Sequence, residues 1–300
     1  MSFLIYKRWS RRIKCGAAFR VIMVVKTILF TDLGRDISDL VAVAYAARAT
    51  DLRLVVASGP DAELKARMID AMFGYFGSTA QVLVGSTSPY CTYHYFDPAT
   101  QQEVATEDPV VETITRTIEE NQGIRVVMCA PMTDLARVCD SHPHILRNKV
   151  ESVYVQGSCR RYAQKASIDA HSRNLRLDRE AAVKVFKLMD ILPFTFVPER
   201  AVKKFPRASC SLVDRRLDAY VANVIRQEGM ICKPADLMTV MTLTQPQNFA
   251  FESFTCSDYV QHHRMVKDAP DYAQNAAFAL KQLFGQPRLQ GLVRRVENNR

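Results

Sequence analysis

Short apolar runs rich in β-branched residues alternate with longer stretches of helical periodicity from about residue 26 onward. Several of the short runs are largely apolar, as is typical of parallel strands that are buried on both faces. Strands that alternate with helices predict βαβ units and a mainly parallel, Rossmann-like open α/β sheet flanked by helices. The expected strands are 26–31, 52–58, 81–84, 124–129, 150–156 and 193–198, and the expected helices are 37–49, 61–77, 108–121, 131–139 and 178–190.

The pattern changes in the last third of the chain. From about residue 210 it is helical with little strand signal, and helices are expected at 211–227, 234–243 and 269–284. No internal repeat, low-complexity linker or glycine-rich hinge divides the chain. The sequence therefore predicts a basic N-terminal extension, 1–25, followed by a single α/β domain, 26–300, with a helical C-terminal region.

Composition narrows the class of protein. The chain has 300 residues, of which 48% are hydrophobic, enough for a large core. No run of eighteen apolar residues indicates a transmembrane helix. Eight cysteines occur without a CxxC pair, which favours a reducing compartment and argues against a zinc ribbon or a disulfide scaffold.

The net charge of +9 is concentrated at the N-terminus. Residues 1–31 carry seven basic residues and no acid, and the rest of the chain is nearly balanced, so no nucleic-acid partner is expected for the main domain. A basic, acid-free segment with interspersed aromatic residues is typical of a mitochondrial presequence or a membrane-surface helix. The alternatives are a cytoplasmic protein with a disordered tail, or one whose functional start is Met23.

Three aspartates fall within eight residues in the stretch 28–40, ILFTDLGRDISDL, directly after the first expected strand. N-capping and the helix dipole account for acids in a first helical turn and explain Asp36 well, but they do not explain Asp32, which precedes the glycine. Ligands of an open parallel sheet bind at the carboxyl ends of its strands. Converging carboxylates without a basic partner repel each other unless a cation lies between them, and oxygen ligands favour Ca²⁺ or Mg²⁺. The stretch therefore predicts a hard-metal site.

The same stretch resembles the N-terminal motif DTDIGDDIDDAL of the inosine-uridine preferring nucleoside hydrolases. Further segments resemble that family in the same order along the chain, from about residue 26 to 250. They are VLVGSTSPY (82–90), MCAPMTDLA (128–136), VYVQG (153–157), NLRLDREAA (174–182), PFTFVP (193–198) and DLMTVMTLTQP (236–246).

The resemblance implies a metal-dependent hydrolase that cleaves the N-glycosidic bond of a nucleoside or related N-riboside. It implies a Ca²⁺ ion held by Asp32, Asp39, the backbone carbonyl of Cys129 and Asp236. Asp32 would act as general base on a water molecule, and Asn174 would bind the sugar. Family members are commonly dimers or tetramers, so the resemblance also allows a homo-oligomer.

Several positions of the family pattern are replaced. The leading aspartate is Phe30, and a ribose-binding aspartate aligns with Ser38. The replaced sugar-binding shell predicts a changed substrate or a lower rate. The remaining replacements are Ser172 and Ala166 for the glutamate and asparagine that contact the sugar, Ala235 for a histidine, and Gly59 for an asparagine after the second strand.

Other groups in the same loops are candidates to contact the substrate. His171 and Arg173 directly precede Asn174, and with Asp169, Arg160, Arg161 and Lys165 they form a charged segment that suits a phosphorylated substrate. The alternative is a polar surface loop. Tyr90, Tyr93, His94 and Tyr95 can stack on a base or simply pack together. His142, His144, His262 and His263 have no metal-ligand spacing and are expected at the surface.

Three functions remain open from the sequence. The first is a nucleoside hydrolase, which the retained metal ligands favour. The second is a catalytically silent relative that binds a nucleoside-like ligand or a partner protein, which the replaced sugar contacts favour. The third is a nucleic-acid-associated protein attracted through the basic extension, whose binding would depend on salt and on residues 1–25.

Overall fold

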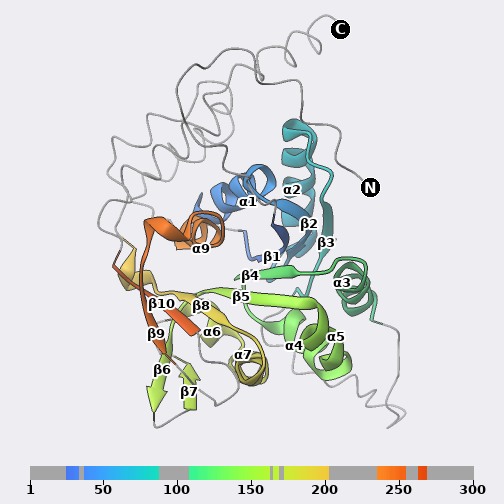
Figure 1. Ribbon diagram of the computed structural model, residues 1–300. Helices are drawn as coiled ribbons and strands as arrows, with labels where there is room; N and C mark the ends of the chain where they lie inside the picture. The colour runs from blue at the N-terminus through green and yellow to red at the C-terminus, as the bar shows by residue number, and fades with distance from the viewer. Residues whose placement is uncertain are drawn as a thin grey trace, which may run out of the picture.

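The computed structural model describes residues 25–33, 37–87, 108–162, 165–168, 172–202, 235–254 and 263–268. Their main feature is an eight-stranded sheet in the order β3-β2-β1-β4-β5-β8-β10-β9, in which only β9 pairs antiparallel (Figure 1). The strands are β1 (Lys26–Thr31), β2 (Asp51–Ala57), β3 (Gln81–Val84), β4 (Ile124–Cys129), β5 (Val150–Gln156), β8 (Phe194–Val197), β9 (Ala250–Phe254) and β10 (His263–Asp268). The predicted mainly parallel α/β sheet is confirmed.

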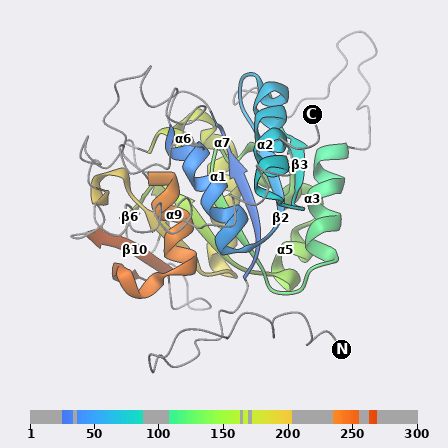
Figure 2. The same cartoon turned by 90° about the horizontal axis from the view of Figure 1, so that it is seen from above.

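Helices cover both faces of this sheet, because each buried strand directs apolar side chains to two sides. In β1, Leu29 packs with one hydrophobic cluster, and Ile28 and Phe30 pack with the other. The first cluster lies beneath α1 (Ile37–Ala49), α2 (Ala62–Phe76) and α9 (Ala235–Thr244), which Figure 2 shows side by side. The second lies against α3 (Pro109–Glu119), α4 (Thr133–Ser141), α5 (Pro143–Lys149) and α7 (Arg179–Phe186).

Shorter elements join these layers. A two-stranded antiparallel sheet of β6 (Cys159–Tyr162) and β7 (Lys165–Ile168) follows β5, in a segment where the sequence indicated a loop. The remaining short helices are α6 (Arg173–Leu177), η1 (Lys187–Asp190), η2 (Glu199–Ala201) and η4 (Pro246–Asn248). Within the described ranges, no helix is both long and apolar enough to cross a membrane.

The predicted elements match the observed ones closely in the first two thirds of the chain. All six predicted strands and the helix at 37–49 lie within one residue of their observed bounds. The predicted helix at 178–190 continues as 3-10 helix η1 after Phe186. The predicted helices at 211–227 and 269–284 and the basic extension lie outside the described residues.

The C-terminal region contains strands that the sequence did not predict. The prediction of little strand structure after residue 210 is wrong for β9 and β10, which extend the sheet beyond β8. His263, expected at the surface, is fully buried in β10, where its Nδ1 accepts a hydrogen bond from the backbone amide of Phe194 at 3.2 Å. The charged residues Arg264 and Lys267 of β10 are exposed and interrupt its apolar pattern, so the sequence did not indicate a strand there.

Candidate functional site

The strand order reverses direction at β1, because the chain passes from β1 to β2 and β3 on one side and returns to β4 on the other. Such a switch point opens a crevice at the carboxyl ends of the central strands. Thr31 and Cys129 are register partners at the ends of β1 and β4. Asp32 follows Thr31 directly, so it lies at the mouth of this crevice.

Two further aspartates reach this edge from the first turns of helices. Asp39 of α1 is buried, and its Oδ1 accepts a hydrogen bond from the Thr31 hydroxyl at 2.9 Å. Asp236 of α9 is also buried, and its backbone amide donates to the Ser38 hydroxyl at 3.1 Å. Residues separated by about 200 positions in the sequence are therefore joined at the start of α1 and α9.

The thiol of Cys129 lies at the same edge of the sheet as these carboxylates. It is completely buried and donates a weak hydrogen bond to the backbone carbonyl of Asp236, with a sulfur-to-oxygen distance of 3.8 Å. Burial raises the pKa of this thiol well above its ordinary value, and the charges of Asp236, Asp39 and Asp32 raise it further. The thiol is therefore kept protonated, and in this form it is a poor nucleophile.

Lys65 of α2 also belongs to this edge, and the sequence analysis did not find it. Its ammonium donates a hydrogen bond to the backbone carbonyl of Ser58 at 3.1 Å. Burial lowers the pKa of Lys65, while the charges of Asp32, Asp39 and Asp61 oppose that shift. The only sequence signal was that Lys65 falls beside the buried stripe Ala62, Ile69 and Phe73 of α2. The carboxylates therefore have a basic neighbour, contrary to the assumption behind the predicted metal site.

The loop that carries the Ser58 carbonyl is held by a buried polar network. The Asp134 carboxylate at the start of α4 accepts from the Ser58 hydroxyl at 2.7 Å and from the Ser86 backbone amide at 3.1 Å. Arg137 donates to both Asp134 and Asp108, and Asp108 caps α3. This network fixes the ends of β2 and β3 beside the crevice.

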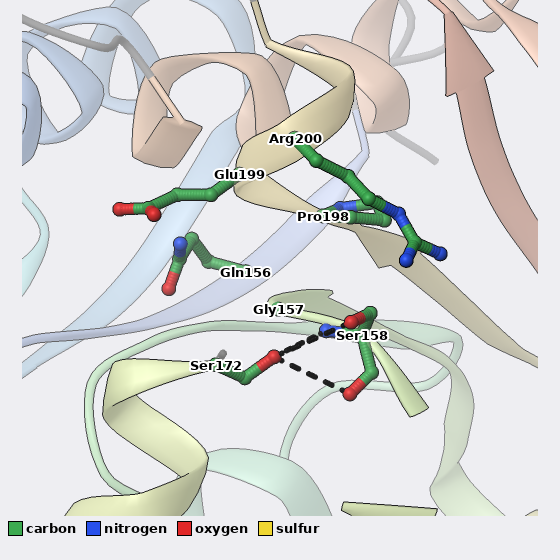
Figure 3. A pocket seen from close by; sticks show the side chains of 7 residues that line it. All are labelled: Gln156, Gly157, Ser158, Ser172, Pro198, Glu199 and Arg200. Atoms are coloured by element: carbon green, nitrogen blue, oxygen red, sulfur yellow. Dashed lines mark hydrogen bonds between the residues drawn. The ribbon is translucent and has the colours of Figure 1, made fainter. Parts of the chain in front are cut away.

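The predicted sugar-binding residues lie at the ends of β5 and β8. The Ser172 hydroxyl accepts from the Ser158 amide at 2.8 Å and donates to the Ser158 carbonyl at 3.3 Å, so it secures the turn after β5. The Asn174 side-chain amide donates to Oε1 of Gln156 at 3.2 Å. Figure 3 shows the small cavity beside these groups, of about 80 Å³, lined by Gln156, Gly157, Ser158, Ser172, Pro198, Glu199 and Arg200.

The structure thus brings the four predicted metal-binding residues, Asp32, Asp39, Cys129 and Asp236, to one edge of the sheet. Within the part of the chain that the structure describes, no three His, Cys, Asp or Glu side chains are arranged as a ready metal site. Carboxylates and a strand-end carbonyl are nevertheless the donors that a hard cation prefers, so the donor set fits such an ion chemically. His171, Asp36, Asp169 and the tyrosines after β3 lie outside the described residues.

Comparison with known proteins identifies relatives of this fold. A family model for the inosine-uridine preferring nucleoside hydrolases matches residues 27–281, somewhat beyond the segment in which the sequence motifs were found. A comparison with curated protein sequences found no match.

Similar solved structures cover most of the chain. One is the type III effector protein XopQ complexed with adenosine diphosphate ribose, with a TM-score of 0.70 and 17% identity over 87% of this chain and 94% of that chain. A purine-preferring ribonucleoside hydrolase from Gardnerella vaginalis has a TM-score of 0.63 and 16% identity, over 86% and 98%. An inosine-uridine preferring nucleoside hydrolase from Bacillus anthracis has a TM-score of 0.61 and 14% identity, over 86% and 100%.

Proposed function

Because the chain belongs to the inosine-uridine preferring nucleoside hydrolase family, we propose that it hydrolyses the N-glycosidic bond of a nucleoside or related N-riboside. The observation that supports this most directly is that Asp32 follows the end of β1, while Asp39 and Asp236 lie in the first turns of α1 and α9 at the same edge of the sheet. Hydrolysis of this bond passes through an oxocarbenium-like transition state, which nearby carboxylates stabilise.

Asp32 is the proposed general base. It is partly buried at the mouth of the crevice, so it can contact a water molecule while the sugar excludes bulk solvent. In that position it would take a proton from the water that attacks the anomeric carbon. No group is assigned to protonate the leaving base, since Ala235 stands where the family resemblance implies a histidine.

A hard divalent cation, which we propose to be Ca²⁺, would be held by Asp32, Asp39, Asp236 and the backbone carbonyl of Cys129. When bound, such an ion supplies Lewis acidity that makes a coordinated water a better nucleophile at neutral pH. Asp39 and Asp236 are buried, and buried carboxylates favour a compensating positive charge.

Asn174 and Gln156 are the proposed contacts to the sugar. Their side chains are buried and joined by a hydrogen bond of 3.2 Å, so each holds the other in a fixed orientation. An amide retains both donor and acceptor groups for ribose hydroxyls. The cavity next to Gln156 would hold a substituent of the sugar ring.

A second candidate function is a catalytically silent protein that binds a nucleoside-like ligand. The hydroxyls of Ser38 and Ser172 both hydrogen-bond to backbone groups at positions where the resemblance implies sugar-binding carboxylates. A relative of this fold was solved with adenosine diphosphate ribose, which supports including such ligands in the test.

The test is a hydrolysis screen with the full-length chain. Purine and pyrimidine ribosides, deoxyribosides, nucleoside 5′-monophosphates and adenosine diphosphate ribose would be incubated with CaCl₂ or with chelator, and free sugar would be measured. Chelator-sensitive release of sugar from any of them supports the hydrolase. Absence of release, together with a rise in melting temperature on adding one of the compounds, supports the silent binder.

A further inference from the structure

Lys65 places a positive charge at the edge of the sheet where Asp32, Asp39 and Asp236 lie, which we call the carboxylate edge. No sequence motif indicated this lysine. It lies on α2, in the segment between β2 and β3, and its side chain turns back toward the end of β2. The hydrogen bond to the Ser58 carbonyl fixes its ammonium, and the charges of Asp32 and Asp39 act on that ammonium.

The absence of a side chain at Gly59 leaves room for the Lys65 ammonium next to Asp32. A Cβ atom on Gly59 would lie 3.3 Å from Nζ of Lys65 and 3.8 Å from Cβ of Asp32. Those two distances place the ammonium and Asp32 on the same side of Gly59. The family resemblance implies an asparagine at this position, and a side chain of that size would occupy the space next to Nζ. Glycine also suits the backbone here, since φ is +84°.

We propose that Lys65 is a built-in cation of the carboxylate edge, which replaces part of the positive charge of a divalent ion and lowers the affinity of the site for that ion. This inference rests on the proposed metal-binding role of Asp32, Asp39 and Asp236. The physical reason is repulsion: an ammonium held close to the ion opposes its binding, and partial burial limits screening by solvent and salt.

The group that binds the Lys65 ammonium is itself held in place. This acceptor, Ser58, is fixed through its hydroxyl by the buried Asp134 carboxylate, and through its backbone amide by the Thr31 carbonyl at 2.9 Å. A lysine on a flexible surface loop would move away from an incoming ion. Moving away would cost Lys65 its hydrogen bond to Ser58, and this cost favours keeping its charge at the edge.

The experiment is calorimetric titration of the full-length chain with CaCl₂ in metal-free buffer, comparing wild type with Lys65→Met. Methionine keeps most of the length of the unbranched side chain and removes the charge. We expect the variant to bind Ca²⁺ about ten-fold more tightly. Lys65→Arg keeps the charge and should bind like wild type. Arg67→Met removes a charge from an exposed position of the same helix and should also leave the affinity unchanged.

A second measurement uses the melting temperature. In chelator, Lys65→Met should have a lower melting temperature than Arg67→Met, because the carboxylates have lost their internal cation, and added CaCl₂ should remove this difference. Equal calcium affinity in wild type and Lys65→Met, or weaker affinity in the variant, overturns the inference and leaves the proposed metal site standing. No calcium binding by either protein overturns the inference and the metal site together.

Discussion

The backbone amide of Asp236 donates a hydrogen bond of 3.1 Å to the hydroxyl of Ser38, and this bond joins the first turn of α9 to the first turn of α1. Both residues are buried. Ser38 therefore helps to place two of the proposed metal-binding carboxylates, Asp39 beside it and Asp236 opposite.

Ser38→Ala is expected to lower the free energy of unfolding by about 1–2 kcal/mol, because the Asp236 amide loses its acceptor in a buried place. Urea denaturation followed by circular dichroism would measure the change. Ser141→Ala is the matched control, since the Ser141 hydroxyl is exposed and its partners are the backbone carbonyl of Arg137 and the ring of His142. Equal stability of the two variants would contradict the structural role of Ser38.

The sequence predicted the central part of the fold well because the information there is local. Strands such as β1 and β4 contain continuous apolar segments, Ile28–Phe30 and Val126–Cys129, and the helix at 37–49 was bounded correctly. Strand β10, which lies between β8 and β9, escaped prediction because the charged residues Arg264 and Lys267 interrupt its apolar pattern. A pattern of this kind becomes a strand only once β8 and β9 provide its partners.

Part of the candidate site could be predicted from the sequence. Asp32, Asp39 and Asp236 were found from motifs, because the family resemblance links segments far apart in sequence. Lys65 was not found, since its proximity to Asp32 depends on how α2 packs against the sheet. The hydrogen bonds of Ser172 to the backbone of Ser158 also depend on tertiary structure, which no spacing in the sequence reveals.

Gly85→Ala is expected to destabilise the protein by about 2 kcal/mol or more. A Cβ atom on Gly85 would lie 2.5 Å from Oδ2 of Asp134 and 2.7 Å from the Ser58 hydroxyl, so the buried network after β2 would have to move. Gly74→Ala is the control, because a Cβ atom there meets nothing within 4 Å and should stabilise α2 by about 0.5–1 kcal/mol. Thermal unfolding of both variants tests the prediction, and a shift in the same direction would contradict it.

Stability is expected to fall in mild acid because of His263. Burial lowers the pKa of His263, while the Met189 carbonyl and the Asp190 charge oppose the shift. The unfolded chain binds a proton on this histidine near its ordinary pKa of about 6.5, and the folded chain binds it only at lower pH. The stability that the protein gains from a neutral, buried His263 is therefore fully present above pH 6.5. It is lost as the pH falls below that value.

His263→Phe tests this expectation. The new ring fits between aromatic neighbours such as Phe194 and Phe254, but the Phe194 amide loses its acceptor, which costs about 1–3 kcal/mol at pH 8. The loss of stability between pH 6.5 and pH 5, measured by urea denaturation, should become smaller than in wild type. His144→Gln changes an exposed histidine and should keep the wild-type slope. An unchanged slope in His263→Phe would assign the acid sensitivity to other groups.

Asp32→Asn is expected to reduce the rate of hydrolysis by about 10²–10⁴-fold on whichever N-riboside the protein cleaves, since an amide cannot act as general base. The substitution keeps the size of the side chain, so the circular dichroism spectrum should stay that of wild type. Asp70→Asn, on the exposed side of α2, removes one negative charge away from the crevice and should leave the rate unchanged. If both variants keep the wild-type rate, Asp32 is not the base. If both lose it equally, the effect comes from net charge and not from the position of Asp32 at the end of β1.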